Sequence, residues 1–163
     1  MIPRNTAACD IEIRQDGHII VSIGVCDIGG GQRSSVAQIA ASLLGVPLED
    51  VTLRQADTAM TPPVGATVGS KTLYYCSNDT FMAANALRNR LLEVAADLLE
   101  MRVDDLVLQD GEISVKDQSG KTLALLNTIA EASVRDIPLT EHAVFQTPKA
   151  RKFELVLLQN LRR

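Results

Sequence analysis

The sequence predicts a single α+β domain with the element order ββαβαββαβ. Two segments alternate apolar and polar residues with period two and reach the turn dipeptides Asp16-Gly17 and Asp110-Gly111, which favour hairpins. Two other segments repeat apolar residues with the period of an α-helix. With 163 residues, 46% of them apolar, the chain is long enough to bury one core. Because no repeat or linker divides it, we expect a domain over residues 1–148 and a C-terminal extension over residues 149–163.

In the first half, Cys9–Arg14 and Ile19–Cys26 are expected to form a hairpin whose second strand is covered on both faces. A two-residue turn with positive φ at Asp16 and Gly17 would connect the strands. A helix is predicted after the glycine cluster, with Ser34 or Ser35 as its cap and Gly45 at its end. Its apolar stripe consists of Val36, Ile39, Ala40, Leu43 and Leu44. A short strand, Val51–Leu53, follows.

In the second half, a polar loop with Pro and Gly residues is expected from Asp57 to about Lys71. A longer helix should begin near Asn78 or Asp79. The remaining predicted elements are a hairpin of Leu106–Leu108 with Ile113–Val115, a helix over Thr122–Arg135 and a strand at Ala143–Phe145. The extension joins the basic run Lys149–Lys152 to apolar residues. This pattern fits a terminal strand or helix that docks on the core, and also an amphipathic partner helix or a membrane-surface segment.

Composition excludes several function classes. A net charge of −4 with a pI near 5.1 does not suit a nucleic-acid surface, and 3% aromatic residues provide few stacking platforms. No apolar run is long enough to cross a membrane and no signal peptide is recognisable, so a cytoplasmic location is expected. Cys9, Cys26 and Cys76 are interpreted as reduced core thiols, and His18 and His142 as structural residues. We assign no catalytic residue and no metal ligand from these patterns.

Two segments could hold a ligand. Gly29, Gly30 and Gly31 follow a buried strand and precede a helix, where backbone N–H groups and the helix N-terminus can bind an anion. A tight strand-to-helix turn would explain the same glycines, and neither a dinucleotide fingerprint nor a P-loop is present. The second segment, the loop over residues 57–72, combines hydroxyls, small residues and one cation. Its composition suits a polar ligand, and equally a solvated surface loop.

From Gly17 to Val115 the chain resembles part of the large, molybdopterin-binding subunit of the xanthine dehydrogenase/aldehyde oxidase family. That family carries a D-I-G-Q-G-x-x-T motif, then A-Q-I-A, L-G-V-P, G-D-T and G-S-R-S-T, in this order. The corresponding segments here are Asp27–Ser34, Ala37–Ala40, Leu44–Pro47, Ala56–Thr58 and Gly69–Leu73. Each motif is weak alone, but five in order are specific.

The resemblance implies that both segments converge on a pyranopterin cofactor, which in bacterial members is often molybdopterin cytosine dinucleotide. The implied contacts are Ile28, Gly29, Gly30, Gly31, Gln32, Thr67, Gly69, Ser70, Lys71 and Thr72. It also implies a molybdenum hydroxylase acting on a purine, aldehyde or related heterocycle. The molybdenum cofactor would carry out the hydroxylation, while FAD and iron–sulfur clusters would reside on partner subunits. Implied partners are those subunits and the remaining domains of the molybdopterin subunit; a homo-oligomer is a further option.

Two features depart from the family pattern. Gly30 stands where the family has a glutamine that reaches the cofactor, and Gln32, two residues on, is a candidate to compensate. Lys71 and Thr72 stand where the family has Arg and Ser. Lysine keeps the charge but lacks the forked donors of a guanidinium, and threonine keeps the hydroxyl. The family's glycine-phenylalanine loop and its G-x-G-E segment with the catalytic glutamate are not found, and Glu131, Glu141 and Glu154 match neither. The isolated chain is therefore expected to be inactive, and the alternative is a decayed paralogue or fragment that serves as a structural or interaction module.

Overall fold

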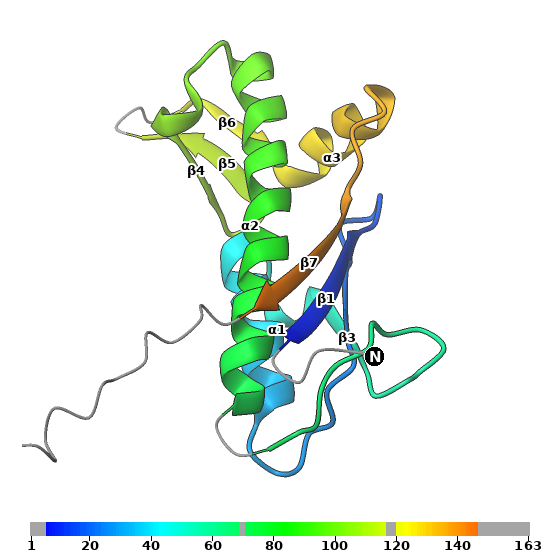
Figure 1. Cartoon of the computed structure of the whole chain (residues 1–163). Coiled ribbons are helices and arrows are strands. Elements are labelled where there is room, and N and C mark those ends of the chain that lie inside the picture. Colours follow the sequence, from blue (N-terminus) through cyan, green and yellow to red (C-terminus); the bar gives the residue numbers. More distant parts are fainter. Residues whose placement is uncertain (1–5, 69–70, 117–119, 147–163) are drawn as a thin grey trace, which may run out of the picture.

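The computed structural model describes residues 6–68, 71–116 and 120–146 and confirms an α+β domain (Figure 1). Its strands are β1 (Thr6–Ile13), β2 (Ile19–Ile23), β3 (Val51–Gln55), β4 (Leu106–Gln109), β5 (Glu112–Val115), β6 (Thr122–Ala124) and β7 (Thr140–Gln146). Its helices are α1 (Gln32–Leu44), α2 (Lys71–Leu99) and α3 (Leu125–Val134), with 3₁₀ turns at Leu48–Asp50 and Val103–Asp105.

The larger sheet has the strand order β3-β2-β1-β7. β1 pairs antiparallel with β2 and β7, while β3 lies parallel to β2 after the crossover through α1. All five residues of β2 are buried, which confirms that both faces of this strand are covered. The turn differs from the expected two-residue form: Arg14 and His18 close a three-residue loop in which only Gly17 has positive φ. A single left-handed residue suffices because three-residue hairpin loops commonly consist of a type I turn followed by one residue in the left-handed region.

The core lies between this sheet and the two long helices. Side chains from β1 and β2 pack against α1 and α2, and the largest fully buried ones include Ile11, Val21, Val36, Leu87 and Leu91. Helix α2, with 29 residues, continues past this sheet to the second, three-stranded sheet (Figure 1). It therefore connects both sheets to one core.

Helix α2 begins at Lys71, so the prediction of a start near Asn78 or Asp79 was wrong. Both residue types favour helix caps, but here they lie inside the helix. The Asn78 amide donates a hydrogen bond to the Tyr74 carbonyl at 2.6 Å, and the Asp79 side chain is fully buried against the core. Packing of Tyr75, Cys76 and Ala83 has outweighed the local capping preference.

The second sheet has the order β4-β5-β6. The β4–β5 hairpin is confirmed, and its turn has positive φ at both Asp110 and Gly111, as a type I′ turn requires. The predicted helix over Thr122–Arg135 was wrong at its start, because Thr122–Ala124 pairs with β5 as β6 and α3 begins at Leu125. The C-terminal extension over residues 149–163 lies outside the described residues.

Candidate functional site

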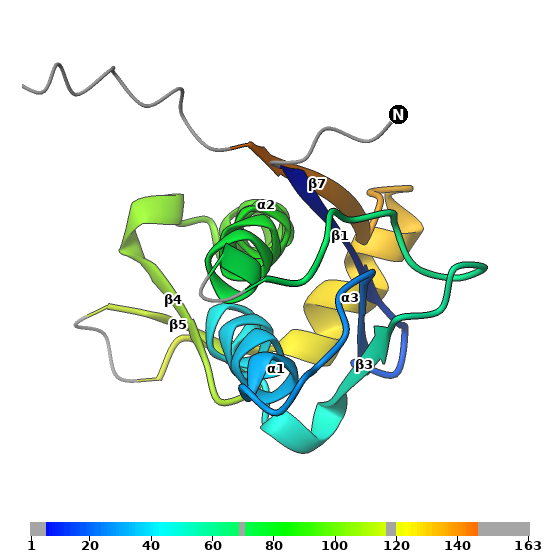
Figure 2. The same cartoon turned by 60° about the horizontal axis from the view of Figure 1, so that its bottom comes forward.

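Helices α1 and α2 lie side by side and run in the same direction, so that their N-termini meet at one end of the molecule (Figures 1 and 2). The glycine segment leads into α1 and the loop over residues 57–68 leads toward α2. Each N-terminus presents backbone N–H groups without intrahelical partners, and the aligned peptide dipoles make both ends positive. Neither first turn contains an acidic residue of its own. The two segments singled out by sequence thus reach the same end of the fold.

In the glycine segment, backbone N–H groups surround the carboxylate of Asp27. Its oxygens accept hydrogen bonds from the amides of Gly29 at 2.9 Å and Arg33 at 3.2 Å. These bonds, with weaker contributions from the amides of Gly31 and Gly30, lower the pKa of Asp27 below its ordinary value. Asp27 thus supplies the capping group that was expected from Ser34 or Ser35. Both serines lie inside the helix, which begins at the left-handed residue Gly31.

Gln32, the first residue of α1, has a buried side chain packed against Gly30. A Cβ atom at Gly30 would lie 2.5 Å from Nε2 and 3.0 Å from Oε1 of Gln32. Gln32 as a whole residue is only 7% exposed, and its side-chain Oε1 has no hydrogen-bond partner. Ile28, by contrast, is 67% exposed at the outer edge of the segment. Gly30, which departs from the family pattern, therefore leaves space for the side-chain amide of Gln32.

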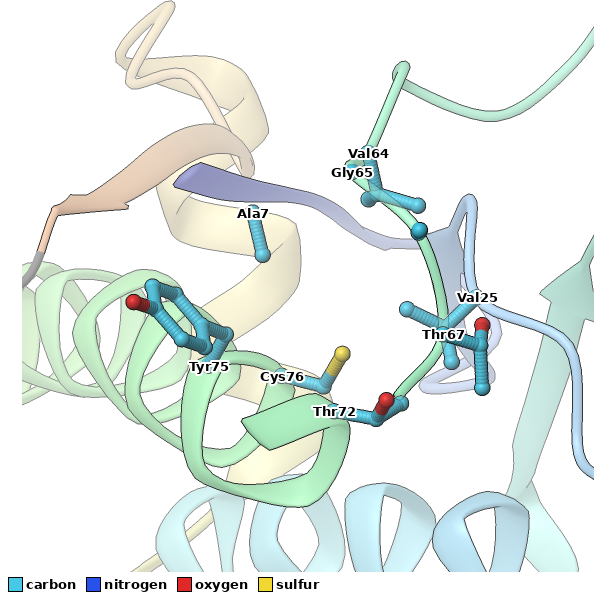
Figure 3. A pocket seen from close by; sticks show the side chains of 9 residues that line it. Ala7, Val25, Val64, Gly65, Thr67, Thr72, Tyr75 and Cys76 are labelled. Carbon is cyan, nitrogen blue, oxygen red and sulfur yellow. The ribbon is translucent and has the colours of Figure 1, made fainter. Parts of the chain in front are cut away.

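The second segment lines a small pocket at the start of α2 (Figure 3). The pocket lies between the N-terminal part of β1, the Val64–Thr67 stretch and the first turns of α2. Its lining residues are Ala7, Val25, Val64, Gly65, Ala66, Thr67, Thr72, Tyr75 and Cys76. Thr72 is buried, and its Oγ1 accepts a hydrogen bond from the Val68 amide at 3.0 Å. Val25 lines the pocket, and the chain continues from it through Cys26 and Asp27 into the glycine segment.

The structure brings together some of the residues that sequence singled out. Thr67 and Thr72 line one pocket, and Gly30 contacts Gln32. Gly69, Ser70 and the side chain of Lys71 lie outside the described residues. Cys9 and Cys76 are buried as expected, but Cys26 is exposed, since β2 ends at Ile23 and leaves it in the following segment. In the described part of the chain, no group of three or more His, Cys, Asp and Glu residues could hold a metal ion.

Asp79 was predicted only as a possible helix start, and its burial was not predicted from the sequence. Its carboxyl is fully buried in α2, where Oδ1 accepts a hydrogen bond from the Thr80 hydroxyl at 3.4 Å and Oδ2 has no partner. Burial raises the pKa of Asp79 to about 7. Burial and the charge of Asp79 also raise the pKa of Cys76 to about 12 and that of Cys9 above its ordinary range. The only sequence signal was a charged residue inside an apolar helical period.

Both histidines and the two described glutamates that match no catalytic motif have side-chain partners, most of them distant in sequence. His18 hydrogen-bonds with Thr52 at 2.8 Å, and His142 with Asp10 at 2.5 Å. Glu131 pairs with Arg135, and Glu141 with Arg90. Glu154 lies outside the described residues. Among the described helices, none has the length and apolar character to span a bilayer.

Comparison with known families and proteins points to one group. A family model described as a molybdopterin cofactor-binding domain matches residues 2–156. The nicotine 6-hydroxylase large subunit of Paenarthrobacter nicotinovorans is 30% identical over 105 residues, 64% of this chain and 13% of that protein. The carbon monoxide dehydrogenase large chain of Hydrogenophaga pseudoflava is 30% identical over 119 residues, 72% of this chain and 15% of that protein.

Solved structures agree in fold. Quinoline 2-oxidoreductase from Pseudomonas putida 86 superposes with a TM-score of 0.79 and 26% identity, over 87% of this chain and 19% of that one. A Cu,Mo-CO dehydrogenase superposes with a TM-score of 0.73 and 26% identity, over 90% of this chain and 19% of that one. The chain thus spans less than a fifth of the length of each of these proteins.

Proposed function

Because this chain belongs to the molybdopterin cofactor-binding domain family, we propose that it binds a molybdopterin cofactor and supplies one part of the cofactor site of a molybdenum hydroxylase. The remaining parts would come from further polypeptide, including domains or subunits that carry FAD and iron–sulfur clusters. One observation carries the proposal: the glycine segment and the loop that precedes α2 meet at the neighbouring N-termini of α1 and α2 (Figure 2).

The residues at this end suit the chemistry of the cofactor. A pyranopterin offers N–H donors and acceptor oxygens on its rings and a negatively charged phosphate, which molybdopterin cytosine dinucleotide extends to a diphosphate. The chain offers two helix N-termini, of which that of α1 is already capped by Asp27, together with the hydroxyl of Thr72 and the free acceptor of Gln32. We place Ile28, Gly29, Gly30, Gly31, Gln32, Thr67, Gly69, Ser70, Lys71 and Thr72 in the cofactor site on the strength of the motifs and this position.

The role of this chain would be to position the cofactor rather than to transfer protons. When bound, the molybdenum and its dithiolene ligand supply the oxidation–reduction chemistry of hydroxylation. Glu131 and Glu141, the described glutamates weighed for the role of base, each face an arginine partner away from this end of the fold. The relatives named above differ in the compound that their names specify, so the proposal covers a reaction class and not one substrate.

The test is retention of pterin by the purified full chain. Expression in a host that makes the cofactor should give protein from which a fluorescent oxidised pterin is released on denaturation. Thr72→Val, which removes a buried hydroxyl from the first turn of α2, should lower the yield severalfold. Thr128→Val is the matched control, because Thr128 is also a buried threonine near the start of a helix, α3.

The two outcomes separate the candidate functions. Pterin that is retained by the native chain and by Thr128→Val, but not by Thr72→Val, supports a cofactor-binding role. Folded protein with no pterin in any of the three would contradict it and favour the alternative of a structural or interaction module.

A further inference from the structure

We infer that the glycine segment holds an N–H-bearing edge of the ligand ring, and not its phosphate, through the side-chain amide of Gln32. The inference rests on the proposed function and assigns the ring end of the ligand to the glycine segment. Its evidence is the contact between Gln32 and Gly30, the unpaired acceptor of Gln32 and the position of the Asp27 carboxylate.

Gly30 and Gln32 form one unit. Gly30 lies outside the left-handed region, so its backbone conformation does not require glycine, unlike that of Gly29 or Gly31. What a side chain at position 30 would meet is the end of the Gln32 amide, 2.5 Å from the added Cβ. A side chain at position 30 would therefore displace the end of the Gln32 amide from its present position.

The Gln32 amide has an unused acceptor. Its Oε1 is buried and has no hydrogen-bond partner, although the residue is only 7% exposed. A buried acceptor without a donor is unfavourable, and an N–H group on a ligand would remove that cost. A phosphate carries only acceptor oxygens when fully ionised, so it cannot pair with Oε1.

The charge at this segment also disfavours a phosphate. The Asp27 carboxylate already takes the amides of Gly29 and Arg33, which are the donors that an anion would need. A second anion would compete for these donors and be repelled by Asp27. The glycine segment is therefore a poor site for a phosphate.

Nuclear magnetic resonance of the full chain, labelled with ¹⁵N, tests this assignment. At about pH 7.5 the protein is titrated with pterin, which carries ring N–H groups and no phosphate, and separately with methyl phosphate, a monoester that is almost fully ionised at this pH. We expect pterin to shift the side-chain NH₂ signals of Gln32 and phosphate to leave them unchanged. Gln38, exposed on the same helix, provides the reference signal, and Gln32→Leu and Gln38→Leu assign the two.

The variants separate a ligand contact from a structural role. Gln32→Leu should weaken pterin binding about tenfold, leave phosphate binding unchanged, and leave the melting temperature equal or higher, since an unpaired acceptor is removed. A merely structural glutamine would lower the melting temperature instead. Gln38→Leu should change none of the three values.

Gly30→Ala provides an independent perturbation of the same unit. Its Cβ should displace the amide and reduce pterin affinity as Gln32→Leu does, and the double variant should show no further loss. Equal pterin affinity in Gln32→Leu and the native chain, or a phosphate-induced shift of the Gln32 signals, would overturn the inference while the proposed function stands. A native chain that binds neither pterin nor phosphate would overturn both.

Discussion

At the scale of single residues, the buried carboxyl of Asp79 makes folding depend on pH. Together with burial, its charge raises the pKa of the Cys9 and Cys76 thiols, and one of its two oxygens has no hydrogen-bond partner. Its pKa of about 7 in the folded chain is well above the value near 3.8 that an exposed aspartate has. At a pH between these two pKa values, Asp79 is therefore protonated in the folded chain and ionised in the unfolded chain.

This difference predicts that stability falls as pH rises. Between about pH 4 and 7 the free energy of unfolding should decrease by about 1.4 kcal/mol per pH unit from Asp79 alone, and then level off. Asp79→Asn should remove this decrease and be the more stable protein at pH 8. Urea unfolding midpoints measured at several pH values check both statements. Parallel curves for the native chain and Asp79→Asn would contradict the assignment.

At the scale of elements, the two ends of α1 are fixed by different means. Its N-terminus depends on Asp27, which reaches back from the preceding segment to the amides of Gly29 and Arg33. Its C-terminus depends on Gly45, a left-handed residue whose carbonyl accepts a hydrogen bond from Gly111 at 2.6 Å. The second contact joins the helix to the β4–β5 hairpin.

For the N-terminus we predict local fraying without Asp27. Asp27→Asn removes the charged acceptor, so the amides of Gly29 and Arg33 should exchange hydrogen faster with solvent, while the amide of Leu44 is unaffected. Because the pKa of Asp27 is lowered, the same effect should appear in the native chain only when acid protonates this carboxyl. Equal exchange in both proteins at neutral pH would rule out this cap.

For the C-terminus, Gly45→Ala should destabilise the chain by about 1–3 kcal/mol. Alanine at this position would have to adopt the left-handed backbone conformation. Its Cβ would lie 3.0 Å from Leu108 Cγ and 3.1 Å from Gln109 Cα. Gly111→Ala is the control for conformation alone, because its φ is 76° and nothing lies within 4 Å of the added atom. It should cost about 1 kcal/mol, and chemical denaturation measures both. Equal losses would show that the contact with β4 is unimportant.

At the scale of the whole molecule, α2 makes the two sheets one folding unit. It packs against β1 and β7 of the first sheet and approaches β4 of the second. Leu87, in its middle, is fully buried. A substitution that destabilises this helix should therefore lower the stability of both sheets.

Leu87→Ala should lower the free energy of unfolding by about 2–5 kcal/mol in a single transition. Slow-exchanging amides of Val21 in the first sheet and Ile113 in the second should report the same loss. Leu98→Ala, at a 41% exposed position of the same helix, should cost much less. Different losses at Val21 and Ile113 would mean that the sheets unfold separately.

Local patterns predicted most of this architecture because turn residues and apolar periods determine hairpins and amphipathic helices. They failed where tertiary contacts outweighed them: the core holds Asn78 and Asp79 inside α2, and pairing with β5 extends Thr122–Ala124 into a strand. The motifs singled out the two segments that form the candidate site. They could not predict that Asp27 would fill the donors of the glycine segment, or that the amide of Gln32 would lie against Gly30, because both depend on side-chain positions in space.

The aromatic cluster beside the pocket gives the chain a built-in optical reporter. The protein has no tryptophan and two tyrosines, Tyr74 and Tyr75, which stack edge-on with each other and with Phe145. Tyr75 also lines the pocket that contains Thr67 and Thr72. All tyrosine emission and the tyrosine bands of near-ultraviolet circular dichroism therefore arise at the start of α2, so a change in either spectrum on adding a ligand reports on that end of the molecule.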